Sequence, residues 1–281
     1  MRMLHLPSLS RPLNCGFLLS FDFDETIYHQ DFRRDDVDRF FKLMRQWREN
    51  FGVMWGVNTG RGPEYFQEGF NHLTEGLSHA FSPDFCVTKE RHIHLPNAQG
   101  VLSPLKSWNQ VCDIAHEQLF CRYGDQLRKM IDRYMIHYSD CQLQVQDDDP
   151  YSVVVDCARK MDDISDEIRR ELIELSEVSI QRAGPYLRFC HREFNKGSAL
   201  SQVMKELDLP TNRLAIFGDA QNDLDAMSHH PDAIWCCPVN ASGEVKDKVC
   251  GHRRGYVSDF PRIQGVLDAL HVVVEPYLIN G

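Results

Sequence analysis

Two carboxylates stand one residue apart at the end of a short apolar segment near the start of the chain. Asp22 and Asp24 follow the run Phe17-Leu-Leu-Ser-Phe, which is typical of a buried strand. Side chains two residues apart on a strand point to the same side, so these two acids would repel each other in surroundings of low dielectric. A divalent cation is the simplest group that would hold them together, although Asp-x-Asp also forms turns and helix caps.

Three other places along the chain carry polar side chains in a similar position. Thr59 follows an apolar run, and Lys196 begins a predicted helix. Asp219 and Asp223 follow another apolar run. The carboxyl ends of parallel strands share one edge of a sheet, where ligands bind. A parallel sheet would therefore bring these side chains close to the first two carboxylates.

The segments around these residues alternate between strand and helix. Apolar residues recur at helical spacing before Gly52, a strand follows at 53–57, and Pro63 begins the next helix. The same alternation returns after residue 190 and continues to the end of the chain. Strands joined by helices pair in parallel, with right-handed connections. The pattern predicts an α/β fold with a doubly wound parallel sheet.

The middle of the chain has a different pattern. Strands are predicted there in pairs, at 84–88 with 92–95, at 142–146 with 151–155 and at 178–180 with 186–189. A long helical segment at about 104–138, interrupted at Gly124, lies between the first two pairs. Paired strands flanked by helices favour an antiparallel α+β module. We therefore predict that residues 83–190 form a domain inserted into a core made of residues 1–82 and 191–281.

The composition is that of an ordinary soluble globular protein, with 42% hydrophobic and 26% charged residues among 281. No apolar run is long enough to span a bilayer, and the ten cysteines include no C-x-x-C pair. We expect a cytoplasmic protein with reduced cysteines and no membrane partner. The net charge of −10 argues against nucleic-acid binding, which needs a basic face. It permits a small anionic substrate where a metal and a few cations reverse the local field.

Taken together and in this order, the four motifs resemble those of the haloacid dehalogenase-like phosphohydrolases. The motifs are Asp22-Phe-Asp24-Glu-Thr26 for D-x-D-x-T, Val57-Asn-Thr59-Gly-Arg61 for a strand that ends in Ser or Thr, Asn195-Lys196-Gly197 for the lysine, and Gly218-Asp219-Ala-Gln-Asn222-Asp223 for G-D-x-x-N-D. The resemblance covers essentially the whole chain. It implies a Rossmann-like core, and the insertion is similar to the large α/β cap of the Cof-type and sucrose-phosphate-phosphatase-like branch.

The resemblance also implies a role for each motif residue. Asp22 would attack phosphorus and carry the phosphoryl group, and Asp24 would act as general acid and then as general base. Mg²⁺ would bind the carboxylates of Asp22 and Asp219 and the main-chain carbonyl of Asp24. The residues implied in phosphate binding are Asn58, Thr59, Gly60 and Lys196, and those that support the metal ligands from behind are Asn222 and Asp223.

The implied reaction is Mg²⁺-dependent hydrolysis of a small phosphorylated metabolite through an aspartyl phosphate. We expect a sugar phosphate, because the insertion is similar to the cap of sugar-phosphate phosphatases, and the cap would close over the leaving group. The candidate substrate-contacting residues are Lys89, Glu90, Arg91, Tyr186, Arg188 and Arg192. The turn formed by the first three departs from the small or amide-bearing turn of many family members. Arg61 is a further candidate for a contact with the substrate or the cap, and no feature of the sequence fixes the oligomeric state.

Three other functions were weighed against this one. A phosphomutase would share the core and the cap type and would need a bisphosphate activator. A dehalogenase would keep an aspartate nucleophile but would not need Asp24, Asp219 and Asp223 as a metal-binding set, so the intact set argues against it. A module that binds a phosphorylated ligand without turnover is disfavoured because each motif residue is present.

Two further patterns have a metal-binding alternative. His92 and His94 could bind a metal from one face of a strand, but no third ligand is in view, so we expect an ordinary strand. Asp147, Asp148 and Asp149 could bind calcium, but the glycine and the terminal glutamate of a calcium loop are missing. We expect a solvated turn there.

Overall fold

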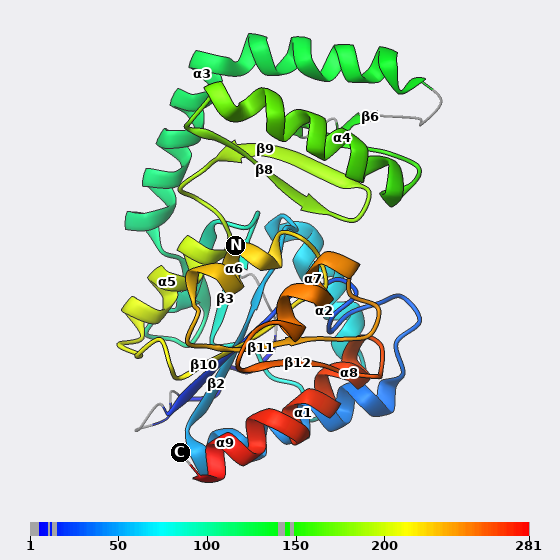
Figure 1. The fold of residues 1–281 in the computed structure, drawn as a ribbon. Coiled ribbons are helices and arrows are strands. Elements are labelled where there is room, and N and C mark those ends of the chain that lie inside the picture. Colours follow the sequence, from blue (N-terminus) through cyan, green and yellow to red (C-terminus); the bar gives the residue numbers. More distant parts are fainter. Residues whose placement is uncertain (1–5, 11, 13–15, 140–143, 147–148, 281) are drawn as a thin grey trace.

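The computed structural model describes residues 6–10, 12, 16–139, 144–146 and 149–280. A large sheet flanked by helices forms the lower part of the molecule in Figure 1, and a smaller sheet with two helices lies above it. Asp147 and Asp148 of the predicted solvated turn lie outside the described residues. Among the described residues, no helix is long and apolar enough to cross a bilayer.

The large sheet has eight strands in the order β12-β11-β10-β1-β2-β3-β4-β5. Its parallel strands are β1 (Phe17–Phe21), β2 (Val53–Asn58), β3 (Phe85–Thr88), β10 (Leu214–Phe217), β11 (Ile234–Cys237) and β12 (Gly255–Val257). Two antiparallel strands, β4 (His92–Pro96) and β5 (Leu102–Pro104), extend one edge. The predicted α/β class with a parallel sheet is confirmed.

Helices cover both faces of this sheet, as a doubly wound fold requires. The helices of the core are α1 (Arg34–Phe51), α2 (Pro63–Thr74), α5 (Lys196–Glu206), α6 (Asp223–His229), α7 (Gly243–Cys250), α8 (Arg262–Ala269), a π-helix (Leu270–Val274) and α9 (Glu275–Asn280). Leu19 and Phe21 of β1 pack with α1, α2 and α8, whereas Leu18 packs with α5, α6 and α7. This alternation follows from the two-residue period of a strand.

The end of α1 illustrates how the sequence sets these elements. Gly52 adopts a left-handed conformation with φ 66°, and its N–H donates to the carbonyl of Arg48. Glycine pays little for this conformation, so the helix ends there and β2 begins one residue later. The predicted helix stop at Gly52 is therefore confirmed, and Trp47 and Phe40 of the same helix are buried in the core.

The smaller sheet is antiparallel, in the order β6-β7-β9-β8. Its strands are β6 (Gln144–Gln146), β7 (Asp149–Val154), β8 (Val178–Ala183) and β9 (Tyr186–His191), and its helices are α3 (Lys106–His137) and α4 (Ala158–Glu171), the latter followed by a 3₁₀ turn (Leu172–Glu174). These elements bury an apolar cluster of their own. A separate core is the property expected of a domain.

The interruption predicted at Gly124 is wrong, because α3 is continuous from Lys106 to His137. Figure 1 shows this helix changing direction between its first and second halves. Gly124 is required by packing, since a Cβ there would lie 2.6 Å from the Tyr151 hydroxyl oxygen. Bending, rather than breaking, lets one helix both leave the large sheet and cover the small one.

The sheet pairing bears on where the insertion begins. Strands β3, β4 and β5, which the sequence assigned to the insertion from residue 83, pair within the eight-stranded sheet. We therefore propose that the inserted domain begins with α3 and ends with β9. An antiparallel hairpin at the edge of a parallel sheet has the same local pattern as an α+β module, which is why the sequence placed the boundary too early.

Candidate active site

Asp22 lies at the carboxyl end of β1, where the parallel ladder continues for one more residue. Its main-chain N–H donates to the carbonyl of Phe217 at the end of β10, at 2.8 Å. The residue is buried, with 8% exposed. This bond fixes the carboxylate beside the loop that follows β10, so the first and the fourth motif lie next to each other.

The ammonium of Lys196 contacts two carboxylates. Nζ lies 2.5 Å from Oδ1 of Asp22 and 2.7 Å from Oδ1 of Asp223. Lys196 is the first residue of α5, and Asn195 caps this helix through its side-chain oxygen, which accepts from two N–H groups of the first turn. Asn58 at the end of β2 donates from Nδ2 to the carbonyl of Lys196, at 3.0 Å. The cap and this bond together fix the buried lysine.

The loop after β10 folds around the carboxylate of Asp223. Its Oδ2 accepts from the N–H groups of Asp219 and Ala220, both at 3.0 Å. A Cβ at Gly218 would lie 2.3 Å from Cγ of Asp223, so only glycine leaves room for this carboxylate. Asp219 accepts a hydrogen bond from the Thr26 hydroxyl, at 2.9 Å. Thr26 had no predicted role of its own, and this hydrogen bond makes it a group that orients Asp219.

These acids form a buried cluster with an excess of negative charge. One oxygen from each of Asp22, Asp219 and Asp223 lies within 4.8 Å of the others. Burial raises the pKa of Asp22 well above its ordinary value; Lys196 opposes this shift, and the other two acids add to it. Burial and the charge of Asp223 raise the pKa of Asp219 to about 7. Burial disfavours the ammonium of Lys196, but Asp22 and Asp223 outweigh it and raise its pKa.

Such a cluster fits a hard divalent cation. Each of the three acids can offer a carboxylate oxygen toward a common point, and carboxylate oxygens are the ligands that Mg²⁺ and Ca²⁺ prefer. Burial and mutual repulsion raise the pKa values of Asp22 and Asp219, and a cation there would oppose both effects. Both oxygens of Asp223 already accept hydrogen bonds from the protein, which leaves Asp22 and Asp219 better placed to bind a metal.

Thr59 and Gly60 form a turn that is tied to the hairpin between β3 and β4. The N–H of Thr59 donates to the carbonyl of Val87, and its own carbonyl accepts from the N–H of Glu90, both at 2.9 Å. The hydroxyl of Thr59 accepts from the N–H of Arg61 at 3.1 Å. The turn is therefore fixed by main-chain bonds, and Thr59 is 1% exposed.

Asp24 does not join the acidic cluster. Its carboxylate is bound by Arg61 through two hydrogen bonds, Nε to Oδ2 at 2.8 Å and Nη2 to Oδ1 at 2.6 Å. The guanidinium also lies 5.1 Å from the ring centroids of Phe23 and Tyr28. Arg61 thus contacts the predicted general acid rather than the cap. This bidentate pair joins residues 37 positions apart and had no signal in the sequence.

The inner face of the small sheet brings cap residues toward this site. On β8 and β9, Gln181 pairs with Arg188 and Ala183 with Tyr186, so these side chains share one face. On that face, Nη1 of Arg188 lies 3.9 Å from Oε2 of Glu90, and Nε2 of Gln181 donates to Oδ2 of Asp225 at 2.8 Å. The loop after β10 also contacts the cap, because the N–H of Asn222 donates to the carbonyl of Arg182 at 3.0 Å.

The other predicted substrate contacts are placed differently. Lys89 and Arg91 lie in a turn of the large sheet rather than in the cap, and Arg91 donates to the carbonyl of Lys89. Arg192 follows β9 and donates to the carbonyl of Val178 at 3.2 Å. Glu90, in contrast, is buried and accepts from Nδ2 of Asn222 at 2.8 Å. Glu90 and Arg188 therefore lie together.

As expected, His92 and His94 belong to an ordinary strand, β4. Nε2 of His92 lies 2.7 Å from Oδ1 of Asp113. His94 is buried, and burial lowers its pKa to about 4. In the part of the chain that the structure describes, the group of acids, cysteines or histidines close enough to hold a metal is the aspartate cluster.

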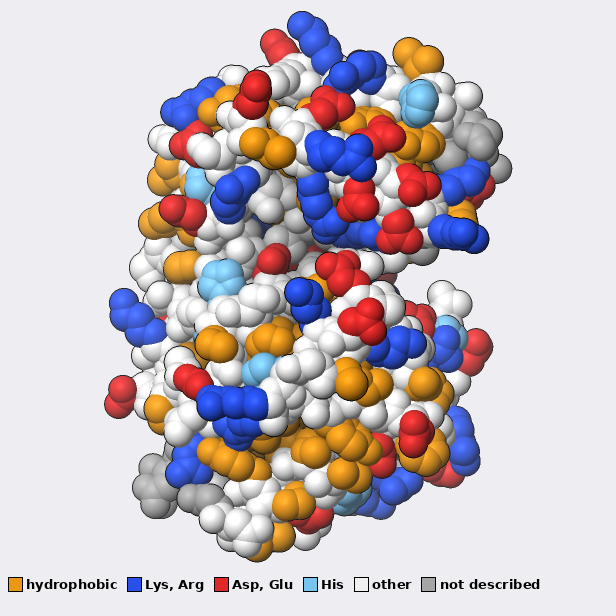
Figure 2. Space-filling view, viewed as in Figure 1, with side chains coloured by type: hydrophobic (Ala, Val, Ile, Leu, Met, Phe, Trp, Pro, Cys, Tyr) orange, Lys and Arg blue, Asp and Glu red, His pale blue; other side chains and the backbone are white. Residues whose placement is uncertain are grey.

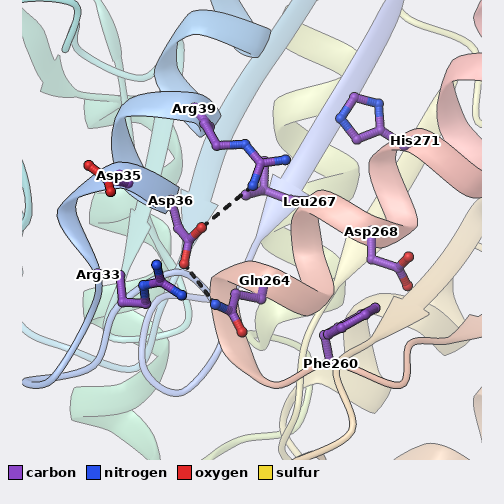
Figure 3. A pocket seen from close by; sticks show the side chains of 9 residues that line it. All are labelled: Arg33, Asp35, Asp36, Arg39, Phe260, Gln264, Leu267, Asp268 and His271. Atoms are coloured by element: carbon purple, nitrogen blue, oxygen red, sulfur yellow. Dashed lines mark hydrogen bonds and ion pairs between the residues drawn. The ribbon is translucent and has the colours of Figure 1, made fainter.

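A cavity of about 580 Å³ lies away from the aspartate cluster, between the start of α1 and α8 (Figure 3). Its polar side chains largely contact one another or nearby residues. Asp36 accepts from Gln264 at 2.9 Å and pairs with Arg39 at 3.7 Å, and Asp268 accepts from the Tyr256 and Ser258 hydroxyls. Size alone therefore does not identify the functional site.

Comparisons with known proteins agree with this architecture. The model of the haloacid dehalogenase-like hydrolase family matches residues 122–250, a stretch that contains Lys196, Asp219 and Asp223. The sucrose-phosphatase of Synechocystis sp. PCC6803, solved in complex with sucrose and phosphate, is 18% identical with a TM-score of 0.67, over 91% of this chain and 97% of that one. No curated protein matches the chain by sequence.

Two bacterial structures show the same likeness. A haloacid dehalogenase-like hydrolase, yhjK of Bacillus subtilis, is 15% identical with a TM-score of 0.59, over 96% of this chain and 93% of that one. SMU.1108c of Streptococcus mutans UA159 is 15% identical with a TM-score of 0.59, over 94% and 99%. The chain therefore has the haloacid dehalogenase-like fold over nearly its whole length, and the resemblance inferred from the four motifs is confirmed.

Proposed function

We propose that this chain, which carries the haloacid dehalogenase-like fold and family match, is a Mg²⁺-dependent phosphatase that hydrolyses a sugar phosphate through an aspartyl phosphate. The observation that carries the proposal is the buried carboxylate of Asp22, which contacts Lys196 at 2.5 Å beside Asp219. A nucleophile, a cation and an acidic metal-binding group meet there at the carboxyl edge of a parallel sheet. That combination suits phosphoryl transfer, whose catalysis depends mainly on positioning and charge neutralisation.

Asp22 is the nucleophile in this proposal. One of its oxygens is held by Lys196, and the other would attack phosphorus in line with the leaving alcohol. Lys196 is buried and stays charged, because neighbouring carboxylates raise its pKa. It would donate to the phosphoryl oxygens together with Thr59, Asn58 and the main chain of Gly60. Charge develops on those oxygens in the transition state, where fixed donors stabilise it most.

The metal would be held by the carboxylates of Asp22 and Asp219 and by the main-chain carbonyl of Asp24. When bound, Mg²⁺ would neutralise the phosphate and the carboxylate that approach each other. Thr26 orients Asp219 for this task, at 2.9 Å. Asp223 and Asn222 support the site from behind, and Asp223 does so by fixing both Lys196 and the loop that carries Asp219.

Asp24 would give a proton to the leaving alcohol and later take one from water. Its carboxylate is paired with Arg61 in the structure, so the pair would have to shift or separate when the substrate enters. Separation from Arg61 would let Asp24 take up a proton, which it then gives to the leaving oxygen, so the acid would be in place only when a substrate is present. Arg61 is therefore a positioning residue in this proposal.

The sugar-phosphate assignment rests on the cap. The neighbouring sucrose-phosphatase structure contains sucrose and phosphate, and this chain places polar side chains on the inner face of the same kind of sheet. A phosphomutase with the same core is the second candidate, because the residues that transfer the phosphoryl group would be the same. A mutase would show itself by needing a bisphosphate activator. A binding module without turnover is the third.

The experiment is Mg²⁺-dependent phosphate release from a panel of sugar phosphates, nucleotides and small organic phosphates, with Asp22→Asn as the blank. We expect release concentrated on one or a few sugar phosphates. If a folded wild-type protein releases no phosphate but isomerises a sugar phosphate once a sugar bisphosphate is added, the mutase assignment replaces this one. If it binds phosphorylated ligands and turns none over, the enzyme assignment fails.

A further inference from the structure

Buried oxygens without a hydrogen-bond donor gather where the cap meets the large sheet. Among the described residues, Oε2 of Glu90, Oδ1 of Asn222 and Oε1 of Gln181 have no hydrogen-bond donor, and these residues are 2%, 4% and 2% exposed. A buried acceptor without a donor costs free energy, so native proteins rarely keep one without a reason. Three of them around one junction indicate that a ligand supplies the donors.

The orientation of both amides is fixed by what they contact. Nδ2 of Asn222 donates to Oε1 of Glu90, and Nε2 of Gln181 donates to Oδ2 of Asp225, both at 2.8 Å. A carboxylate only accepts hydrogen bonds, so each amide must turn its nitrogen toward it. The atoms of these residues that are left to bind a ligand are therefore oxygens, and Nη1 of Arg188 brings a donor close to Oε2 of Glu90.

Glu90 places one of these acceptors beside the phosphate-binding turn. Its N–H donates to the carbonyl of Thr59 at 2.9 Å, and a Cβ added to Gly60 would lie 3.2 Å from its Oε1. Thr59 and Gly60 are the proposed phosphate-binding residues. A group bound by Glu90 would thus lie next to the phosphate, where the leaving group of a phosphomonoester begins.

The backbone at Glu90 is strained. Lys89 and Glu90 both adopt left-handed conformations, with φ 49° and 63°. Glycine takes such conformations at no steric cost, and most other residues do not. The chain instead keeps a buried carboxylate in this turn, and strain of this kind is typical of residues held for function.

The cap supplies the opposite side of the junction. Gln181 and Arg188 lie on the same face of the small sheet, and Nη1 of Arg188 is 3.9 Å from Oε2 of Glu90, longer than a hydrogen bond. A cavity of about 210 Å³ lies beside β8, where Gln181, Asn222 and Asp225 line it together with Arg169 and Leu172 of the cap. Glu90 and Arg188 are not among the described residues that line it. Figure 2 shows the molecule hollowed between its upper and lower parts. The volume is below the roughly 300–1,000 Å³ usual for pockets that take drug-sized ligands.

We propose that Glu90, Asn222 and Gln181 accept hydrogen bonds from hydroxyl groups of the substrate's leaving group and so select a neutral, hydroxyl-rich leaving group of about one sugar ring. The inference rests on the proposed phosphatase function and adds the residues that recognise its substrate. A second phosphate in this place would set more acceptors against the carboxylate of Glu90, so bisphosphates and nucleoside di- and triphosphates are disfavoured. Because Glu90 belongs to a turn of the large sheet, selection of the substrate would depend on the core as well as on the cap.

The test compares two phosphomonoesters with and without hydroxyls on the leaving group. The first is the sugar phosphate that the wild type hydrolyses best, and the second is p-nitrophenyl phosphate. In Glu90→Gly the left-handed turn is retained, because glycine favours it. We expect kcat/KM for the sugar phosphate to fall by about 10- to 100-fold, as for the loss of a hydrogen bond to a charged group. Hydrolysis of p-nitrophenyl phosphate should stay close to wild type.

Two further variants complete the design. Gln181→Leu removes an acceptor on the cap, where the backbone is unstrained, and should show the same selective loss. Glu193→Gln changes an exposed carboxylate between the cap and the core and should change neither rate. Equal losses with both esters, or no loss with the sugar phosphate, would overturn the assignment, because a structural role or water would then explain the unpartnered oxygens. If the wild type hydrolyses neither ester, the proposed function fails, and this inference falls with it.

Discussion

The phosphate end and the leaving-group end of the candidate site are built in different ways. At the phosphate end, Asp22, Lys196 and Asp223 are held by one another and by main-chain bonds from the core. At the leaving-group end, one oxygen each of Glu90 and Gln181 has no hydrogen-bond donor among the described residues, and Nη1 of Arg188 lies 3.9 Å from Oε2 of Glu90. In the proposed reaction the chemistry would thus be arranged in advance, whereas recognition would be completed only by a ligand.

The difference follows from the elements that contribute to each end. The phosphate end comes from the ends of β1, β2 and β10 and the start of α5, which belong to one packed sheet. The leaving-group end combines a strained turn of that sheet with the inner face of a second sheet. Changes at the first end should therefore affect all substrates alike, and changes at the second should affect them selectively.

Asp22→Asn should have the largest effect, because it removes the nucleophile but preserves the side chain's shape. We expect kcat to fall by about 10⁴-fold or more with any ester. Burial raises the pKa of Asp22, so its charge is held at a cost, and the variant should unfold at the same temperature or higher. Phosphate release and thermal unfolding measure the two effects, with Glu64→Gln on the exposed face of α2 as the control. Turnover close to wild type would exclude Asp22 as the nucleophile.

Removal of Mg²⁺ should abolish turnover with every ester, since the metal belongs to the phosphate end. Saturating Mg²⁺, at about 100 times its Kd, should raise the free energy of unfolding by about 2.7 kcal/mol. Ca²⁺ should bind and inhibit, because its larger and looser shell misplaces the nucleophile. Asp219→Asn should weaken the Mg²⁺-dependent rise in melting temperature. A chelator without effect on either rate or melting temperature would mean that the aspartate cluster serves another purpose.

Arg61→Lys should have an intermediate effect and separates positioning from binding. Lysine keeps the charge but cannot make the two parallel hydrogen bonds to Asp24. We expect kcat to fall by about 10- to 100-fold with little change in KM, because a displaced acid/base group slows chemistry without weakening binding. The loss should be smaller for p-nitrophenyl phosphate, whose leaving group needs no proton. A rise in KM with kcat unchanged would place Arg61 among the substrate-binding residues.

The sequence predicted the phosphate end of the candidate site better than the leaving-group end. Asp22, Lys196, Asp219 and Asp223 could be brought together from sequence because ends of parallel strands share one edge. That rule depends only on the order of strands and helices, which hydrophobic spacing indicates well. The residues of the phosphate end could therefore be predicted, but the distances between them could not.

The leaving-group end was less predictable because it depends on contacts between distant segments. Pairing of Arg61 with Asp24, and of Glu90 with Asn222, joins residues 37 and 132 positions apart without any local pattern. The proposed later start of the insertion has a related reason, since the β3–β4 hairpin is locally the same whether it extends a parallel sheet or begins a new one. Only the register against β2 decides between these cases.

A fall in pH should have the smallest effect of these changes. His116 reports the effect of acid on stability at the cap side of the molecule. His116 lies on α3, where Nε2 accepts from the N–H of His191 at the end of β9 at 3.2 Å and Nδ1 donates to the carbonyl of Cys112 at 2.8 Å. Burial, with a contribution from Arg91, lowers its pKa to about 3. The ring is thus neutral in the folded protein, and it ties together the two connections between the cap and the core.

The sign of the effect follows from proton binding. Between pH 6.5 and 4 the unfolded chain protonates this histidine and the folded chain does not, so the free energy of unfolding falls as the pH falls, by about 3 kcal/mol or less. Asp22 and Asp219, with raised pKa values, act in the opposite direction, so the comparison must be a difference between variants. His116→Gln retains an acceptor for His191 and should lose less stability than wild type over this range in urea unfolding. The exposed control His271→Gln should follow the wild type; if His116→Gln does so too, His116 is already protonated in the folded protein, and the cap is not the acid-sensitive part.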